Sequence, residues 1–141
     1  FKIVTDLERA ADLAVNLGEY ALASEAFIVM PKDELLELGE FACEMLEDSL
    51  KAFRNRDVER AREVIERDRQ MDQRFWNLRT HVLTQLIKSS SACPTAEEAQ
   101  LIAKNTITVL WSIRDLERVG DHAVNICART IYWVSASAEY I

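Results

Sequence analysis

The sequence predicts an all-α protein, and three observations support this. Three glycines and two prolines in 141 residues leave little material for turns, so the elements must be few and long. Apolar residues recur at helical spacing through most of the chain. With 49% hydrophobic residues, the chain is also long enough to bury a core as one domain. We therefore expect a helical bundle with almost no strand.

The first helix is predicted from about Ile3 to Phe27. Its apolar face consists mostly of small side chains, namely Ile3, Leu7, Ala10, Ala14, Leu17 and Ala21. Such a face buries little area unless a neighbour packs closely on it. We expect this helix to pack against the rest of the chain or against a second copy, in a homodimer that exchanges helices.

The second helix is predicted to begin at Pro31, because proline loses nothing at the first helical position. Its apolar face comprises Leu35, Leu38, Ala42, Leu46, Leu50 and Phe53. A third helix follows, capped by Asn55 or Asp57 and ending near Lys88. Its face comprises Ala61, Ile65, Met71, Phe75, Leu78, Val82 and Leu86.

The fourth helix follows a loop from Ser89 to Pro94 and runs to about Val134. Thr95, with Glu98 three residues later, forms the capping box that opens it. Its apolar face comprises Ile102, Val109, Ile113, Leu116, Gly120, Ala123 and Cys127, and the two smallest of these allow a neighbour to approach closely. Because the loop is short, the third and fourth helices are expected to be antiparallel neighbours.

One helical segment occurs twice: residues 6–16 read DLERAADLAVN and residues 115–125 read DLERVGDHAVN, with eight of eleven positions identical. Each copy carries two carboxylates four residues apart, Glu8 with Asp12 and Glu117 with Asp121. This spacing places both side chains on one helix face, one turn apart. Such a pair is mutually repulsive unless a cation lies nearby. The sequence leaves open whether an arginine or a metal ion supplies that cation.

A third pair, Asp68 and Asp72, lies on the third helix. Asp68 falls in the middle of the apolar face and Asp72 about 40° to one side. A carboxylate removed from water costs several kcal/mol unless it is paired, hydrogen-bonded or bound to a cation. If the two helices are antiparallel neighbours, Asp68, Asp72, Glu117 and Asp121 converge on one groove. Oxygen ligands with little imidazole suit calcium, magnesium, manganese or iron better than structural zinc. The alternative partners are arginines, namely Arg69, Arg79, Arg114 and Arg118.

The charge, the cysteines and the hydropathy of the chain exclude several classes of protein. Twenty-four acidic and seventeen basic residues give a net charge of -7, which disfavours nucleic-acid binding. Cys43, Cys93 and Cys127 are odd in number and form no C-x-x-C, so neither disulfides nor a zinc knuckle is indicated, and a reducing cytoplasm is expected. No apolar run approaches the length needed to span a bilayer.

An alternative function is that of a di-iron carboxylate enzyme built on a four-helix bundle, and such an enzyme requires a Glu-x-x-His motif. Leu78 precedes His81 by three residues and Val119 precedes His122, so the motif is missing. His122 points about 100° away from Asp121 and is expected to be exposed or hydrogen-bonded rather than a ligand. No nucleophile lies beside a base, so we expect no catalytic activity. A structural interaction module without metal is the third interpretation.

The string DLERVGDHAVNI, followed by IYWVSASAEYI, resembles the signature helix of the PhoU family, accessory regulators of phosphate uptake. The first copy resembles the same helix of the family's first repeat. This resemblance covers essentially the whole chain and implies two similar three-helix units. Residues 1–28 would then be the last helix of a first repeat and residues 31–141 a complete second repeat. The offset of 109 between the copies would place roughly 75 to 80 further residues ahead of Phe1, so we expect an N-terminally truncated member.

The resemblance also implies a metal site, typically a multinuclear iron or zinc cluster. Its ligands in the second repeat would be Asp68, Asp72, Glu117 and Asp121, with Glu8 and Asp12 forming a weak or empty half-site. Ala11 stands where the second copy has Gly120, so closer packing is expected for the second copy.

The role implied is that of a cytoplasmic adaptor, a negative regulator of the phosphate-starvation response. Family members act on the phosphate ABC transporter and its sensor histidine kinase, and reach the membrane only through these partners. PhoU-like units also occur in other transporters and in potassium-channel regulators, which is the alternative.

Overall fold

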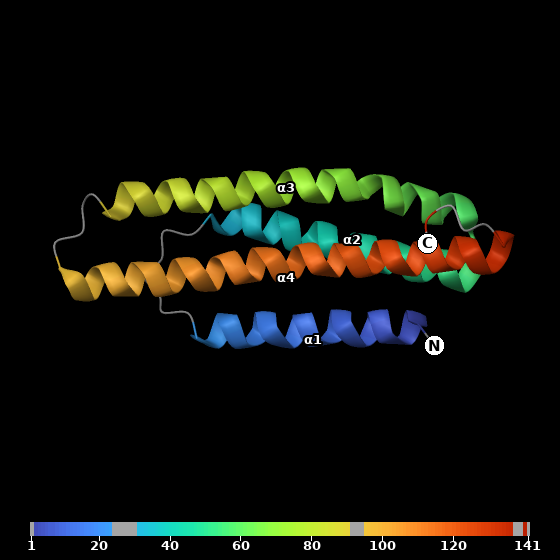
Figure 1. The fold of residues 1–141 in the computed structure, drawn as a ribbon, viewed down its shortest axis with the longest axis horizontal. Helices are drawn as coiled ribbons and strands as arrows, with labels where there is room; N and C mark the ends of the chain where they lie inside the picture. The colour runs from blue at the N-terminus through green and yellow to red at the C-terminus, as the bar shows by residue number, and fades with distance from the viewer. Residues whose placement is uncertain (1, 24–30, 91–94, 137–139, 141) are drawn as a thin grey trace.

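The computed structural model describes residues 2–23, 31–90, 95–136 and 140, with the side chains of residues 89 and 90 excepted. These residues form four α-helices, α1 (Lys2–Ala23), α2 (Lys32–Asn55), α3 (Val58–Ser90) and α4 (Ala96–Ser135), and no strand (Figure 1). The prediction of an all-α protein is therefore confirmed. None of the helices in this part of the chain is both long and apolar enough to cross a membrane.

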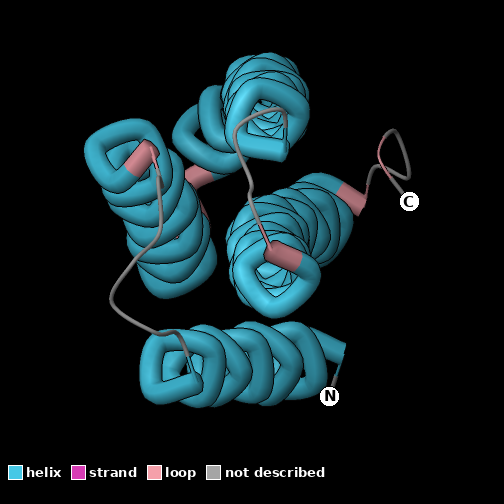
Figure 2. Tube along the Cα trace, turned by 90° about the vertical axis from the view of Figure 1, so that its left-hand side faces the viewer, coloured by secondary structure: helices cyan, strands magenta, loops and turns pink. Residues whose placement is uncertain are grey.

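Helices α2, α3 and α4 pack on one another as a three-helix bundle, and α1 packs on α4 alone among the described helices. Figure 2 shows this arrangement end-on, with α1 beneath α4 and well away from α3. Figure 1 shows that α3 and α4 run in opposite directions, as the short connection predicts. Helix α4 is thus the shared element, because every other helix contacts it.

The helix ends follow the predicted capping residues closely. Helix α2 begins at Lys32, one residue later than predicted, with Pro31 in the capping position. Asp57, not Asn55, caps α3, because its Oδ1 accepts a hydrogen bond from the Arg60 backbone N–H at 3.0 Å. Thr95 Oγ1 accepts from the Glu98 backbone N–H at 3.1 Å, so the predicted cap of α4 is confirmed. The last residues of the predicted first helix and most of the predicted loop lie outside the described residues.

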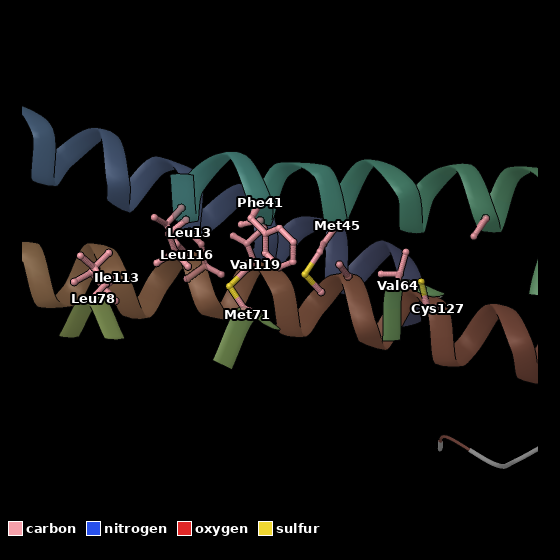
Figure 3. Close-up of a cluster of buried hydrophobic side chains, with 14 of the residues drawn as sticks. Leu13, Phe41, Met45, Val64, Met71, Leu78, Ile113, Leu116, Val119 and Cys127 are labelled. Atoms are coloured by element: carbon pink, nitrogen blue, oxygen red, sulfur yellow. The ribbon is translucent and has the colours of Figure 1, made fainter. Parts of the chain in front are cut away.

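The core lies between α2, α3 and α4, and α1 contributes Leu13 to it (Figure 3). Met45, Met71 and Ile113 are completely inaccessible to solvent. The predicted apolar faces of these three helices are buried or half-buried throughout. Burial raises the pKa of the Cys127 thiol to about 12, so this cysteine is an unreactive packing residue.

The prediction of which residues of α1 are buried is partly wrong, because a different side of the helix from the predicted one faces α4. Asp6, Ala10 and Leu13 are buried against α4, whereas Ala14 and Ala21 are exposed. The outward side carries Val4, Val15 and Leu22, which are 66%, 62% and 90% exposed. At the repeat offset of 109, their equivalents on α4 are Ile113, Val124 and Ile131, all buried or half-buried in the core. The side of α1 that corresponds to the core side of α4 therefore has no described helix over it.

Candidate functional site

The carboxylates of α3 and α4 influence one another across the line along which these two helices pack, which we call the groove. Asp68 and Glu117 are half-buried, and Asp72 and Asp121 are more exposed. Burial raises the pKa of Asp68, and the charges of Asp72 and Asp121 raise it further. Since Asp121 belongs to α4, the two helices share one electrostatic environment.

The α4 members of the group show the same effect from the other side. Burial raises the pKa of Glu117, and Asp121, Asp72 and Asp68 add to the rise. The pKa of Asp121 is also raised, first by burial and then by Asp72, although His122 and Arg118 oppose the rise. The groove therefore holds four mutually repulsive carboxylates.

Arginines do not neutralise these four carboxylates within ion-pair distance in the described part of the chain. Arg79 instead stacks over the ring of Trp76, 5.4 Å from its centroid. The Nε of Arg114 lies 3.8 Å from Oδ1 of Asp115, which is not a member of the group. Arg118 lowers the pKa values of Glu117 and Asp121 only from beyond ion-pair distance. The group's negative charge is thus incompletely compensated by the protein.

The donor chemistry fits a hard cation, because the groove presents only carboxylate oxygens and these repel one another. Asp68 and Asp72 also line a cavity of about 850 Å³, whose other lining residues belong to α3 apart from Tyr140. Yet no three histidine, cysteine, aspartate or glutamate side chains among the described residues form a group that could hold a metal ion. Metal binding would therefore require these side chains to turn toward a common point.

In metal-free protein, Asp68→Asn is expected to raise the free energy of unfolding at neutral pH. The folded pKa of Asp68 lies above its ordinary value of 3.8, so between these two values the folded protein binds more protons than the unfolded chain. The destabilisation is fully present above the folded pKa and is lost as the pH falls toward 3.8. Urea unfolding of chelator-treated wild type and variant between about pH 4 and pH 8 measures the difference. A gain of the same size in acid would contradict an electrostatic origin.

Glu8 and Asp12 lie apart from this group, exposed on α1. Asp12 Oδ2 is 3.6 Å from Arg9 Nη1, an exposed pair on the same helix. Neither Glu8 nor Asp12 contributes to the raised pKa values on α3 and α4. The predicted half-site is thus spatially separate from the groove.

Sequence reasoning missed two buried aspartates, the first residues of the two repeated segments. Asp6 on α1 is only 5% exposed. His122 Nδ1 donates a hydrogen bond to Asp6 Oδ1 at 3.0 Å, because a carboxylate oxygen can only accept. The expectation of a hydrogen-bonded histidine is thus confirmed. Arg129 Nε lies 2.9 Å from Asp6 Oδ2, but its N–H is not aimed at that oxygen, so the contact is an ion pair without a hydrogen bond.

Asp115 on α4 is 2% exposed and is held in the same manner by α1. Its Oδ2 accepts hydrogen bonds from Tyr20 Oη and Asn16 Nδ2, both at 3.2 Å. At the repeat offset, Asp115 is equivalent to Asp6, and Tyr20 is equivalent to Arg129. Tyr20 follows Asp6 by fourteen residues but contacts Asp115, and Arg129 follows Asp115 by fourteen residues but contacts Asp6. These reciprocal contacts mean that α1 and α4 pack antiparallel about an approximate two-fold axis.

A signal for Asp6 was present in the sequence. Asp6 precedes Ala10 by four residues and Leu13 by seven, so it occupies the apolar face that α1 buries. The spacing marks it as a buried charge that needs a partner. Its partners, His122 and Arg129, lie more than a hundred residues away and carry no such signal.

Comparison with known proteins finds a match to the PhoU domain model over residues 35–130. The phosphate-specific transport system accessory protein PhoU of Escherichia coli K12 is 29% identical over 134 residues, which cover 94% of this chain and 52% of that protein. A PhoU homolog of Zymomonas mobilis is 32% identical over 139 residues, covering 98% of this chain and 54% of that protein. The chain spans about half the length of the curated relatives it matches.

Two crystal structures share the fold. PhoU from Pseudomonas aeruginosa superposes with a TM-score of 0.80 at 26% identity, covering 96% of this chain and 61% of that one. The phosphate transport system regulatory protein PhoU from Streptococcus pneumoniae gives a TM-score of 0.82 at 26% identity, with coverages of 97% and 60%.

Proposed function

Since this chain belongs to the PhoU family, whose model matches residues 35–130, we propose that it is a helical regulatory adaptor of phosphate uptake. The names of its relatives support this role, because they are accessory proteins of a phosphate-specific transport system. An accessory role also agrees with a sequence in which no nucleophile lies beside a base.

The proposal extends to the targets and the location. The adaptor acts at the cytoplasmic face of the phosphate ABC transporter and keeps the sensor histidine kinase inactive when phosphate is plentiful. This part is supported by the family resemblance of the repeated DLER helix and by the relatives' names. The outward apolar residues of α1 offer a surface on which a second copy can pack to form a homodimer.

Metal binding is the second part of the proposal. The observation that carries it is the group of four carboxylates on α3 and α4. Burial and neighbouring carboxylates raise the pKa values of Asp68, Glu117 and Asp121, and no arginine among the described residues is ion-paired with the group. Asp68, Asp72, Glu117 and Asp121 would hold a cation or cluster, with Glu8 and Asp12 as a separate half-site. Iron or zinc is favoured by the family resemblance, and magnesium, manganese or calcium by the oxygen ligands.

Asp68→Asn is expected to lose metal and, with it, the sensitivity of thermal unfolding to chelator. Wild type loaded with Zn²⁺ or Fe²⁺ should melt at a lower temperature once chelator is added, because the repulsion in the groove is then no longer offset. The variant should melt at one temperature with and without chelator. In chelator it should be at least as stable as wild type, since the neutral amide removes the repelled charge.

Elemental analysis of each sample decides whether the melts report on metal. Glu66→Gln is the matched control, because Glu66 is an exposed carboxylate on α3 near the groove whose removal should leave metal content unchanged. A loaded wild type that carries metal yet melts identically in chelator would overturn the metal site. So would a wild type that takes up no metal on loading.

A further inference from the structure

A second polar cavity, of about 410 Å³, lies between α1 and α4. It is lined by residues of both repeated segments and their surroundings, namely Arg9, Asp12, Leu13, Val15, Asn16, Arg118 and His122. Arg9 and Arg118 are equivalent, since each is the arginine of a DLER motif. The buried aspartates hold the two helices together, and the carboxylate pairs form the candidate metal site. Arg118 acts on Glu117 and Asp121 only from beyond ion-pair distance. Arg9 forms one exposed pair with Asp12, so the cavity that both arginines line has no assigned role.

The charges that line this cavity are predominantly positive. Arg118 has no carboxylate within ion-pair distance among the described residues. Arg9 is paired with Asp12 at 3.6 Å, but both side chains are more than 60% exposed, and exposed pairs of this kind are weak. Two arginines and a single carboxylate residue thus line the cavity, in a protein whose net charge is -7.

The remaining polar groups are held in place by the buried aspartates. Asn16 donates one amide hydrogen to Asp115 and keeps a second. His122 is fixed through Nδ1 by Asp6, so the ring that lines the cavity has a defined orientation. Leu13, which is buried, and Val15, which is 62% exposed at the outer edge of α1, complete the lining. Donors fixed before a ligand arrives bind it with less loss of conformational entropy.

We propose that this cavity binds a small tetrahedral oxyanion, such as inorganic phosphate or sulfate, between Arg9 and Arg118. The planar guanidinium group offers two parallel N–H donors that match two oxygens of such an anion. The volume lies near the lower end of the range for small-molecule sites and suits an oxyanion with part of its hydration shell. An anion bound there contacts both copies of the repeat and stabilises their packing. Binding does not require a metal ion in the carboxylate groove.

The test is a titration of metal-free, chelator-treated full chain with sodium phosphate and, separately, with sodium sulfate at constant ionic strength. Side-chain NMR signals of Asn16 and His122 should shift and saturate. Arg9→Gln and Arg118→Gln should each weaken binding about tenfold, the scale of one lost charge-assisted hydrogen bond. Asp12→Asn should strengthen binding about twofold, because it removes the one carboxylate that faces the anion.

Arg79→Gln is the matched control, since it removes an arginine that stacks on Trp76 and lies outside the cavity. The gain from Asp12→Asn guards against misfolding as an explanation, because a damaged protein would lose affinity. Saturation by either anion supports the site, and a preference for phosphate identifies the ligand more closely. Shifts that fail to saturate, or an equal loss in Arg79→Gln, would overturn the site in favour of a general salt effect.

Discussion

Asp6→Ala is expected to lower the free energy of unfolding by about 3 kcal/mol, because it leaves Arg129 without its counter-charge. Asp6 is only 5% exposed, and it also accepts the hydrogen bond from His122. Breaking a buried pair from one side is costly because the partner's charge stays partly desolvated. Since α1 packs on α4 alone among the described helices, the loss should begin with local opening of α1.

Urea unfolding measures the overall change, and amide hydrogen exchange in residues 2–23 reports the local opening. Asp12→Ala is the control on the same helix, and it should change stability by less than about 0.5 kcal/mol, because its pair with Arg9 is exposed. Adding Arg129→Ala to Asp6→Ala should restore part of the stability. Equal losses at Asp6 and Asp12 would show that the buried contacts of Asp6 contribute little.

Gly120→Val is expected to destabilise the protein by about 2 kcal/mol through overpacking. A Cβ atom at position 120 would lie 3.1 Å from Met71 Cε and 3.2 Å from Met71 Cγ. Met71 is completely buried, so it has little space into which it can move. The two methyl groups of valine would extend further into the contact between α3 and α4.

Gly18→Val is the matched control, because a Cβ at Gly18 meets nothing within 4 Å. Valine has a slightly higher helix propensity than glycine, so this variant should be neutral or a few tenths of a kcal/mol more stable. Thermal and urea unfolding of both variants give the comparison. A Gly120→Val protein as stable as Gly18→Val would mean that the core near Met71 accommodates the added volume.

Much of the fold and part of the candidate site follow from local sequence. The helical spacing of apolar residues, with Asp57 and Thr95 as caps, predicts the start of α1 and both ends of α2, α3 and α4 to within a few residues, because capping and periodicity act within a turn or two. The same spacing places Gly120 on the apolar face of α4 and so predicts that a neighbouring helix approaches closely there, as Met71 of α3 does. The four-residue spacing likewise places Glu117 and Asp121 on one face of α4, whatever packs against it.

What covers each face is decided by contacts between residues far apart in the sequence. Periodicity shows that Ala14 and Leu13 lie on a helix surface, but only the packing of α1 on α4 buries Leu13 and exposes Ala14. The same holds for charge. No arginine among the described residues is ion-paired with Asp68, and Arg79 stacks on Trp76 instead. Asp6 contacts Arg129, and Asp115 contacts Tyr20, each from the other repeat. A helix period of 3.6 residues specifies which side chains share a face, and only the neighbouring helix determines the partners of that face.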